Sequence, residues 1–116
     1  MAYKTGFTKQ HCGDAVACIA IDGRITQSDG VTEFAHVVRE TAQERPRILV
    51  NLENVLYIDS AGLAELVHGY TLARAQGRAL KLLRPRGRVD MLLRLTRLWN
   101  SFEIFESERD AVASFE

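Results

Sequence analysis

The sequence of 116 residues has little of what several specialised protein classes require. Two cysteines are too few for the disulfide framework of a small secreted domain. They are not spaced C-x-x-C and the three histidines are scattered, so we expect no structural metal site and no cofactor. No apolar run reaches the length of a membrane-spanning helix, and no apolar signal core opens the chain. We therefore expect a reduced, cytoplasmic protein without membrane insertion.

The sequence also lacks a net charge, because 15 basic residues balance 15 acidic ones. No global charge draws the protein to nucleic acid, so we expect no direct contact with nucleic acid. The charges are nonetheless uneven, since eight basic residues and a single acidic residue, Asp90, lie between Arg74 and Arg97. This stretch is either a docking surface or the solvated faces of amphipathic elements. The second interpretation is favoured because no aromatic residues interleave the arginines.

What the chain does contain is typical of a globular domain, with 47% hydrophobic and 26% charged residues. A chain of this length buries one core, so we expect residues 1–116 to form a single domain. Little chain is left over for a deep catalytic cleft. Length and composition therefore favour a binding or switching module over an enzyme.

Apolar runs and helical periodicities alternate along the chain. Apolar runs bounded by turn residues predict five strands, over residues 3–10, 15–21, 47–52, 79–83 and 102–105. Apolar residues at helical spacing predict four helices, over residues 31–42, 60–77, 89–96 and 108–115. The second strand is expected to end at Asp22-Gly23. This order predicts an α/β fold: a mixed, mostly parallel sheet with an antiparallel N-terminal edge, covered by about four α-helices.

The most informative segment reads VLYIDSAGL and ends at Leu63. Ser60 is expected at or beside the N-cap of the second helix, where backbone N–H groups lack partners and the helix dipole favours negative charge. Ala61 and Gly62 are small, so another molecule is expected to approach the backbone there. The negative charge of Asp59 is expected to stabilise the helix N-terminus, its side chain is expected to orient the Ser60 hydroxyl, or it does both.

Two interpretations of Ser60 stay open at this point. As a plain N-cap, its replacement by alanine would cost about 1 kcal/mol. As a phosphoacceptor, it would gain about −1.5 to −2 charges, which a helix N-terminus tolerates but an acidic or apolar partner surface does not. Catalysis by Ser60 is not expected, because Asp-Ser-Ala-Gly is not the G-x-S-x-G context of a hydrolase nucleophile.

The run from Arg47 to Leu63 resembles the core motif of STAS domains, the sulfate transporter and anti-sigma factor antagonist family. In that family a strand ends in Asp-Ser-Ser-Gly-Leu or a close variant. Asp59, Ser60, Gly62 and Leu63 fit this motif, and Ala61 is an accepted variant of its second small residue. The segment Gly23-Arg24-Ile25 resembles the family's Gly-x-Leu before the first helix. The element order agrees over essentially the whole chain.

The resemblance implies an anti-sigma factor antagonist with no catalytic machinery of its own. Such a protein binds an anti-sigma factor that is often a serine kinase; phosphorylation of Ser60 would release it, and a cognate phosphatase would reset it. The partner surface is expected beside Ser60 and on the preceding loop, at Asp59, Ala61, Gly62, Gly23, Arg24, Thr26 and Ser28. We expect a monomer or a weak homodimer. The alternative is a non-switching STAS subunit of a stressosome-like scaffold or a lipid-transport ABC system, in which Ser60 only caps its helix.

Overall fold

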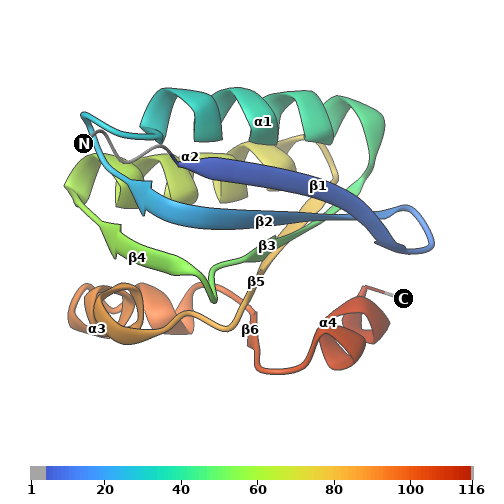
Figure 1. The fold of residues 1–116 in the computed structure, drawn as a ribbon. Coiled ribbons are helices and arrows are strands. Elements are labelled where there is room, and N and C mark those ends of the chain that lie inside the picture. Colours follow the sequence, from blue (N-terminus) through green and yellow to red (C-terminus); the bar gives the residue numbers. More distant parts are fainter. Residues whose placement is uncertain (1–4, 116) are drawn as a thin grey trace.

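The fold is a sheet covered by helices on both faces. The computed structural model describes residues 5–115. Helices α1 (Val31–Glu44) and α2 (Ser60–Ala75) lie on one face of the sheet, and α3 (Gly87–Leu95) and α4 (Glu108–Ser114) lie on the other (Figure 1). The predicted α/β class and its four α-helices are confirmed.

The sheet is mixed, as predicted. Its path runs β1-β2-β3-β5-β6, and β4 pairs with β2 beside this path. Strands β1 and β2 form the antiparallel edge, and all other pairs are parallel. The strands span β1 Gly6–Gly13, β2 Val16–Ile25, β3 Arg47–Asn51, β4 Val55–Ile58, β5 Ala79–Leu83 and β6 Ile104–Phe105.

The boundaries of the first, second and last predicted strands are wrong, and the last, expected over residues 102–105, spans only Ile104–Phe105. The first strand was expected over residues 3–10 but spans Gly6–Gly13, and positions 3 and 4 lie outside the described residues. The second was expected to end at Asp22-Gly23 but continues to Ile25. Gly23 adopts φ 120° and donates its N–H to the carbonyl of Asn54 at 3.1 Å, so the strand gains a new partner there instead of stopping.

Strand β4 was not predicted as an element of its own. The chain turns at residues 53–54 after β3, and β4 then pairs with the last residues of β2. Its burial does not alternate, because Val55 and Ile58 are buried whereas Leu56 and Tyr57 are exposed. The period-two signal of a half-buried strand is therefore missing. A short 3₁₀ helix at Leu98–Asn100 was also not predicted.

The core is divided between two clusters of buried side chains. The larger one joins the sheet to α1, α2 and α3 and includes Phe34, Leu66 and Leu93, which are fully buried. The smaller one lies under α4 and contains Val16, Cys18, Leu49, Leu83, Ala111 and Phe115. No helix within residues 5–115 combines the length and the apolar character needed to cross a membrane.

Candidate functional site

The candidate site forms where two parallel strands end side by side. Ile25, the last residue of β2, pairs with Ile58, the last residue of β4. Thr26 and Asp59 follow directly, so the loop of residues 26–30 begins beside the segment that starts α2. The structure thus brings together the two segments that the sequence analysis singled out for partner binding.

Asp59 is the N-cap residue of α2 and also holds the neighbouring loop. Its Oδ1 accepts the backbone N–H of Gly62 at 2.9 Å, and its Oδ2 accepts the backbone N–H of Gln27 at 2.9 Å. Burial alone would raise the pKa of Asp59, but the hydrogen bonds from backbone N–H groups, led by those of Gln27 and Gly62, outweigh it and lower that pKa. The carboxylate is therefore ionised at neutral pH and completes the positive end of the helix.

Ser60 is the first residue of α2 and is exposed. Its hydroxyl forms no hydrogen bond with any other residue in the range 5–115. The interpretation of Ser60 as a plain N-cap is wrong, because Asp59 is the N-cap residue of α2. Within the described residues, the Ser60 hydroxyl therefore lies at the helix N-terminus without capping it.

Gly62 is buried, and its missing side chain serves the packing of the chain itself. A Cβ at this position would collide with the carbonyl oxygen of Ile25 and lie 2.7 Å from Cγ1 of Ile58. The expectation that another molecule approaches the backbone here is thus corrected for Gly62, since Ile25 and Ile58 occupy that space. Ala61 beside it is half-buried and borders the surface.

The loop before α1 is held by its own backbone and by Thr26. The N–H of Thr26 donates to the carbonyl of Asp29 at 2.7 Å, and Oγ1 of Thr26 accepts the N–H of Asp29 at 3.1 Å. Thr26 and Gly23 are buried, whereas Arg24 and Ser28 are exposed. Of the four residues predicted to bind the partner on this side, only Arg24 and Ser28 present side chains at the surface. Gly23 and Thr26 support the loop from the interior.

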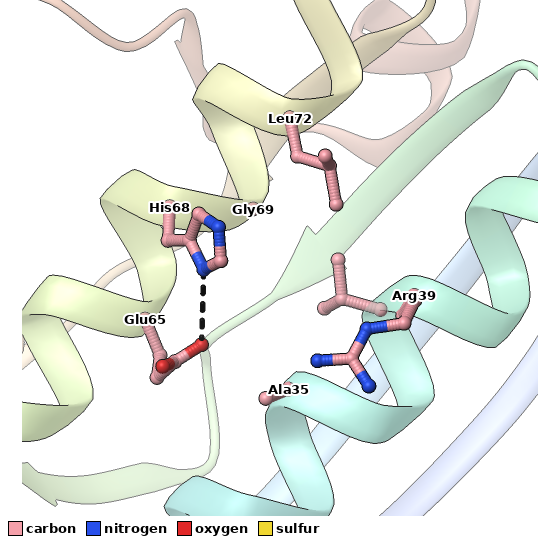
Figure 2. Close-up of a pocket in the computed structure, with 7 residues that line it drawn as sticks. Ala35, Arg39, Glu65, His68, Gly69 and Leu72 are labelled. Carbon is pink, nitrogen blue, oxygen red and sulfur yellow. Dashed lines mark ion pairs between the residues drawn. The ribbon is translucent and has the colours of Figure 1, made fainter. Parts of the chain in front are cut away.

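The hollow between α1 and α2 is a separate feature of the surface. Figure 2 shows Arg39 on one side and His68 with Glu65 on the other, where Nδ1 of His68 lies 3.7 Å from Oε2 of Glu65. Its volume of about 20 Å³ holds about one water molecule, and Ser60 does not line it. Within residues 5–115, no three His, Cys, Asp or Glu side chains gather as metal ligands would.

The arrangement around Ser60 can therefore accept a group from outside but holds little to activate it. The hydroxyl is accessible, the dipole of the 16-residue helix α2 favours added negative charge, and the Asp59 carboxylate already points back at the chain's own N–H groups. No basic side chain contacts the Ser60 hydroxyl within the described range.

Two residues of this arrangement were missed by sequence reasoning. Gln27 holds Asp59 through its backbone N–H, and Ile25 borders Gly62 through its carbonyl oxygen. These contacts use backbone groups, which every residue has, so no sequence motif could have indicated them. Only the pairing of β2 with β4, itself not predicted, places them beside the helix.

The family model of the STAS domain matches residues 11–111, and the chain belongs to this family. Among solved structures, it is similar to an anti-sigma factor antagonist from Mycobacterium paratuberculosis, with a TM-score of 0.83 and 18% identity over 96% of this chain and 93% of that one. It is also similar to the anti-sigma factor antagonist SpoIIAA in its unphosphorylated form, with a TM-score of 0.78 and 16% identity over 95% of this chain and 96% of that one.

A third solved structure is the Bacillus cell fate determinant SpoIIAA in the phosphorylated form. It gives a TM-score of 0.74 and 15% identity over 96% of this chain and 100% of that one. At these identities the likeness concerns the fold. No curated protein sequence matches the chain.

Proposed function

We propose that this protein is an anti-sigma factor antagonist that acts in the cytoplasm and is switched by phosphorylation at Ser60. In its unmodified form it binds an anti-sigma factor that is also a serine kinase. The kinase transfers a phosphoryl group to Ser60 and thereby releases the antagonist, and a cognate phosphatase restores the binding form. The observation that carries this proposal is the exposed Ser60 hydroxyl at a helix N-terminus that Asp59 already caps.

The switch works through local charge. A phosphate on Ser60 would add about −1.5 to −2 charges at the positive end of α2, where the helix dipole favours an anion. The domain itself would therefore stay folded. A partner surface docked over Ser60 would meet this charge together with the nearby Asp59 carboxylate, and an apolar or acidic surface would be repelled.

The descriptions of similar solved structures support this role. Two of the similar structures are described as anti-sigma factor antagonists, and SpoIIAA has been solved in both an unphosphorylated and a phosphorylated form. Because Asp59 caps α2, the same kind of modification at Ser60 would not remove the helix cap.

Binding of the kinase to variants of Ser60 tests the proposal. The ligand is an anti-sigma kinase from the same host that binds the unmodified chain, and its affinity is measured by calorimetry. We expect Ser60→Asp to abolish binding, and Ser60→Ala to bind normally but to stay bound after ATP is added. The matched control is Ser101→Asp, which places the same charge on another exposed serine and should bind like the unchanged chain.

Equal binding of Ser60→Asp and Ser60→Ala would contradict the switch. The non-switching alternative predicts this result, together with a gene neighbourhood that encodes an ABC transporter or a scaffold instead of a kinase. Because Asp59 caps α2, that alternative leaves Ser60 without a role in the chain.

A further inference from the structure

A larger hollow opens at the end of the sheet that lies away from Ser60. Its volume of about 500 Å³ is within the range of about 300–1,000 Å³ that is usual for small-molecule sites. Arg47 and Ala79, the first residues of β3 and β5, pair in parallel register and both line it. Arg47 also pairs with the first residue of β2, whereas Ile58, two residues before Ser60, pairs with the last one. The hollow and Ser60 therefore lie at opposite ends of the sheet.

Most of the charged side chains that line the hollow are basic. They are Arg47, Arg78 and Lys81. Two acidic side chains, Asp14 and Glu103, line it as well, so the lining carries one positive charge in excess. The Lys81 side chain is only 8% exposed, although lysines are rarely buried unless they are paired. The two arginines are half-buried, so three cationic groups border one concave site.

Lys81 has one partner that a ligand can replace. Its Nζ donates to the carbonyl oxygen of Ser114 at 3.0 Å and to the Oγ of Ser114 at 2.9 Å, and these two bonds hold it against α4. Its third contact is the ion pair with Oε2 of Glu103 at 3.3 Å, and the Glu103 side chain is 65% exposed. An ion pair with such an exposed carboxylate contributes little to stability, so an oxyanion in the hollow can take the place of Glu103 on Lys81.

The two arginines are held by neutral backbone groups. Within residues 5–115, Nη1 of Arg47 donates to the carbonyl oxygen of Asp14 at 3.3 Å, and Nη1 of Arg78 donates to the carbonyl oxygen of Arg45 at 3.5 Å. Neither guanidinium forms an ion pair in this range. A guanidinium carries several N–H donors, so most donors of both side chains remain for a ligand. Such groups bind phosphate and carboxylate oxygens in a bidentate manner.

We propose that this hollow binds a small organic phosphate. Its phosphoryl oxygens contact Arg47, Arg78 and Lys81, and its organic part lies against the apolar lining, which includes Phe115. A phosphate monoester carries about −1.5 to −2 charges near pH 7 and three acceptor oxygens, so it matches three cationic groups better than a carboxylate does. The turn at residues 14–15 and helix α4 border the hollow. It is therefore a site for a compact ligand and not the extended basic groove that a nucleic-acid backbone follows.

The test is a titration of the ¹⁵N-labelled chain with phenyl phosphate, followed by NMR at constant ionic strength. We expect saturable shifts of the amide resonances of Arg47, Arg78 and Lys81. Binding should be tighter than that of inorganic phosphate or benzoate, because each of these lacks one part of the ligand. Arg78→Gln should weaken binding about tenfold or more. The matched control Arg39→Gln removes the same charge from an exposed arginine of α1, across the sheet, and should bind like the unchanged chain.

Glu103→Gln gives a second test, with an effect of opposite sign. Loss of this carboxylate removes the anion that competes for Lys81, so the affinity for phenyl phosphate should rise about threefold or more. Glu33→Gln is the matched control, because it makes the same change at an exposed position of α1, and it should leave the affinity unchanged. The amide spectrum of each variant shows whether the chain is folded.

Several results would overturn the proposal. These are the absence of saturable shifts, the same shifts with chloride alone, equal affinity of folded Arg78→Gln and the unchanged chain, and no gain of affinity in Glu103→Gln. Equal affinity for inorganic phosphate would overturn the organic part of the ligand, and equal affinity for benzoate would overturn the phosphoryl group. The titration needs neither Ser60 nor an anti-sigma factor, so its outcome does not depend on the proposed function.

Discussion

The carboxylate of Asp59 accepts the backbone N–H of Gln27 at 2.9 Å, and this bond joins the loop after β2 to the first turn of α2. The same side chain caps α2 through Gly62. One residue therefore fixes both the segment that carries Ser60 and the loop beside it. The position of Ser60 therefore depends on this carboxylate.

Replacing Asp59 should destabilise the protein through the loss of a helix cap. We expect Asp59→Ala to lower the free energy of unfolding by about 1–2 kcal/mol, since both backbone N–H groups lose their partner. Urea denaturation followed by circular dichroism measures this. Asp22→Ala, at an exposed position, is the control and should stay within about 0.5 kcal/mol of the unchanged chain. Equal stability of the two variants would show that Asp59 does not hold the site.

The contribution of Asp59 should also depend on pH in a defined direction. Its pKa is below the ordinary value of 3.8 in the folded chain, so the stabilisation is complete above that value and is lost as the pH falls through the folded pKa. The difference in unfolding free energy between the unchanged chain and Asp59→Asn should therefore be large near pH 7 and shrink below about pH 3.8. A difference that stays constant down to about pH 2 would contradict the lowered pKa.

Gly62→Ala should be far more harmful than a typical change of glycine to alanine in a helix. Alanine ordinarily favours a helix, but here its Cβ would collide with the carbonyl oxygen of Ile25, and α2 would have to move away from β2. We expect a loss of about 1–3 kcal/mol in thermal or urea unfolding. Gly6→Ala is the control, because its Cβ would lie 3.9 Å from the nearest heavy atom, Cβ of Asp22. A stabilising effect of Gly62→Ala would show that α2 is not packed this closely.

The Cys18 thiol should be unreactive in the folded protein. Burial raises its pKa to about 12, and the nearby Cys12 and Glu108 add to the effect. In a Cys12→Ser variant near pH 8, where burial and Glu108 still raise the pKa, we expect Cys18 to react with a thiol reagent at least about tenfold more slowly than a free cysteine, and at the ordinary rate after denaturation. Rapid reaction of the folded variant would mean that α4 does not cover Cys18.

The fold class could be predicted from the sequence because the apolar residues of most helices and strands follow a clear pattern. The helix at Val31–Glu44 places Phe34, Val38 and Ala42 on its buried side at helical spacing, and strand β3 is a short apolar run. Strand β4 was not predicted because it buries only Val55 and Ile58, and because its pairing with β2 is a contact between segments about 30 residues apart. Local patterns do not contain such pairings.

The candidate site could be located from sequence but not resolved in detail. The motif indicated Asp59 and Ser60 at a strand-to-helix junction, and the resemblance to STAS domains gave the family that the family model confirms. Which of the two residues caps α2 depends on side-chain geometry, and the structure assigns the cap to Asp59. The contact of Arg88 with Tyr57 could not be predicted either, because the two residues lie about 30 positions apart in the sequence.

One phosphate on Ser60 is expected to separate this protein from its partner. The most direct measurement is the affinity of the anti-sigma kinase for the chain before and after the kinase has used ATP, with the modified residue mapped by mass spectrometry. We expect a single phosphate on Ser60, loss of binding once it is attached, and persistent binding of Ser60→Ala. A phosphorylated chain that stays bound, or a phosphate that maps to another residue, would contradict it.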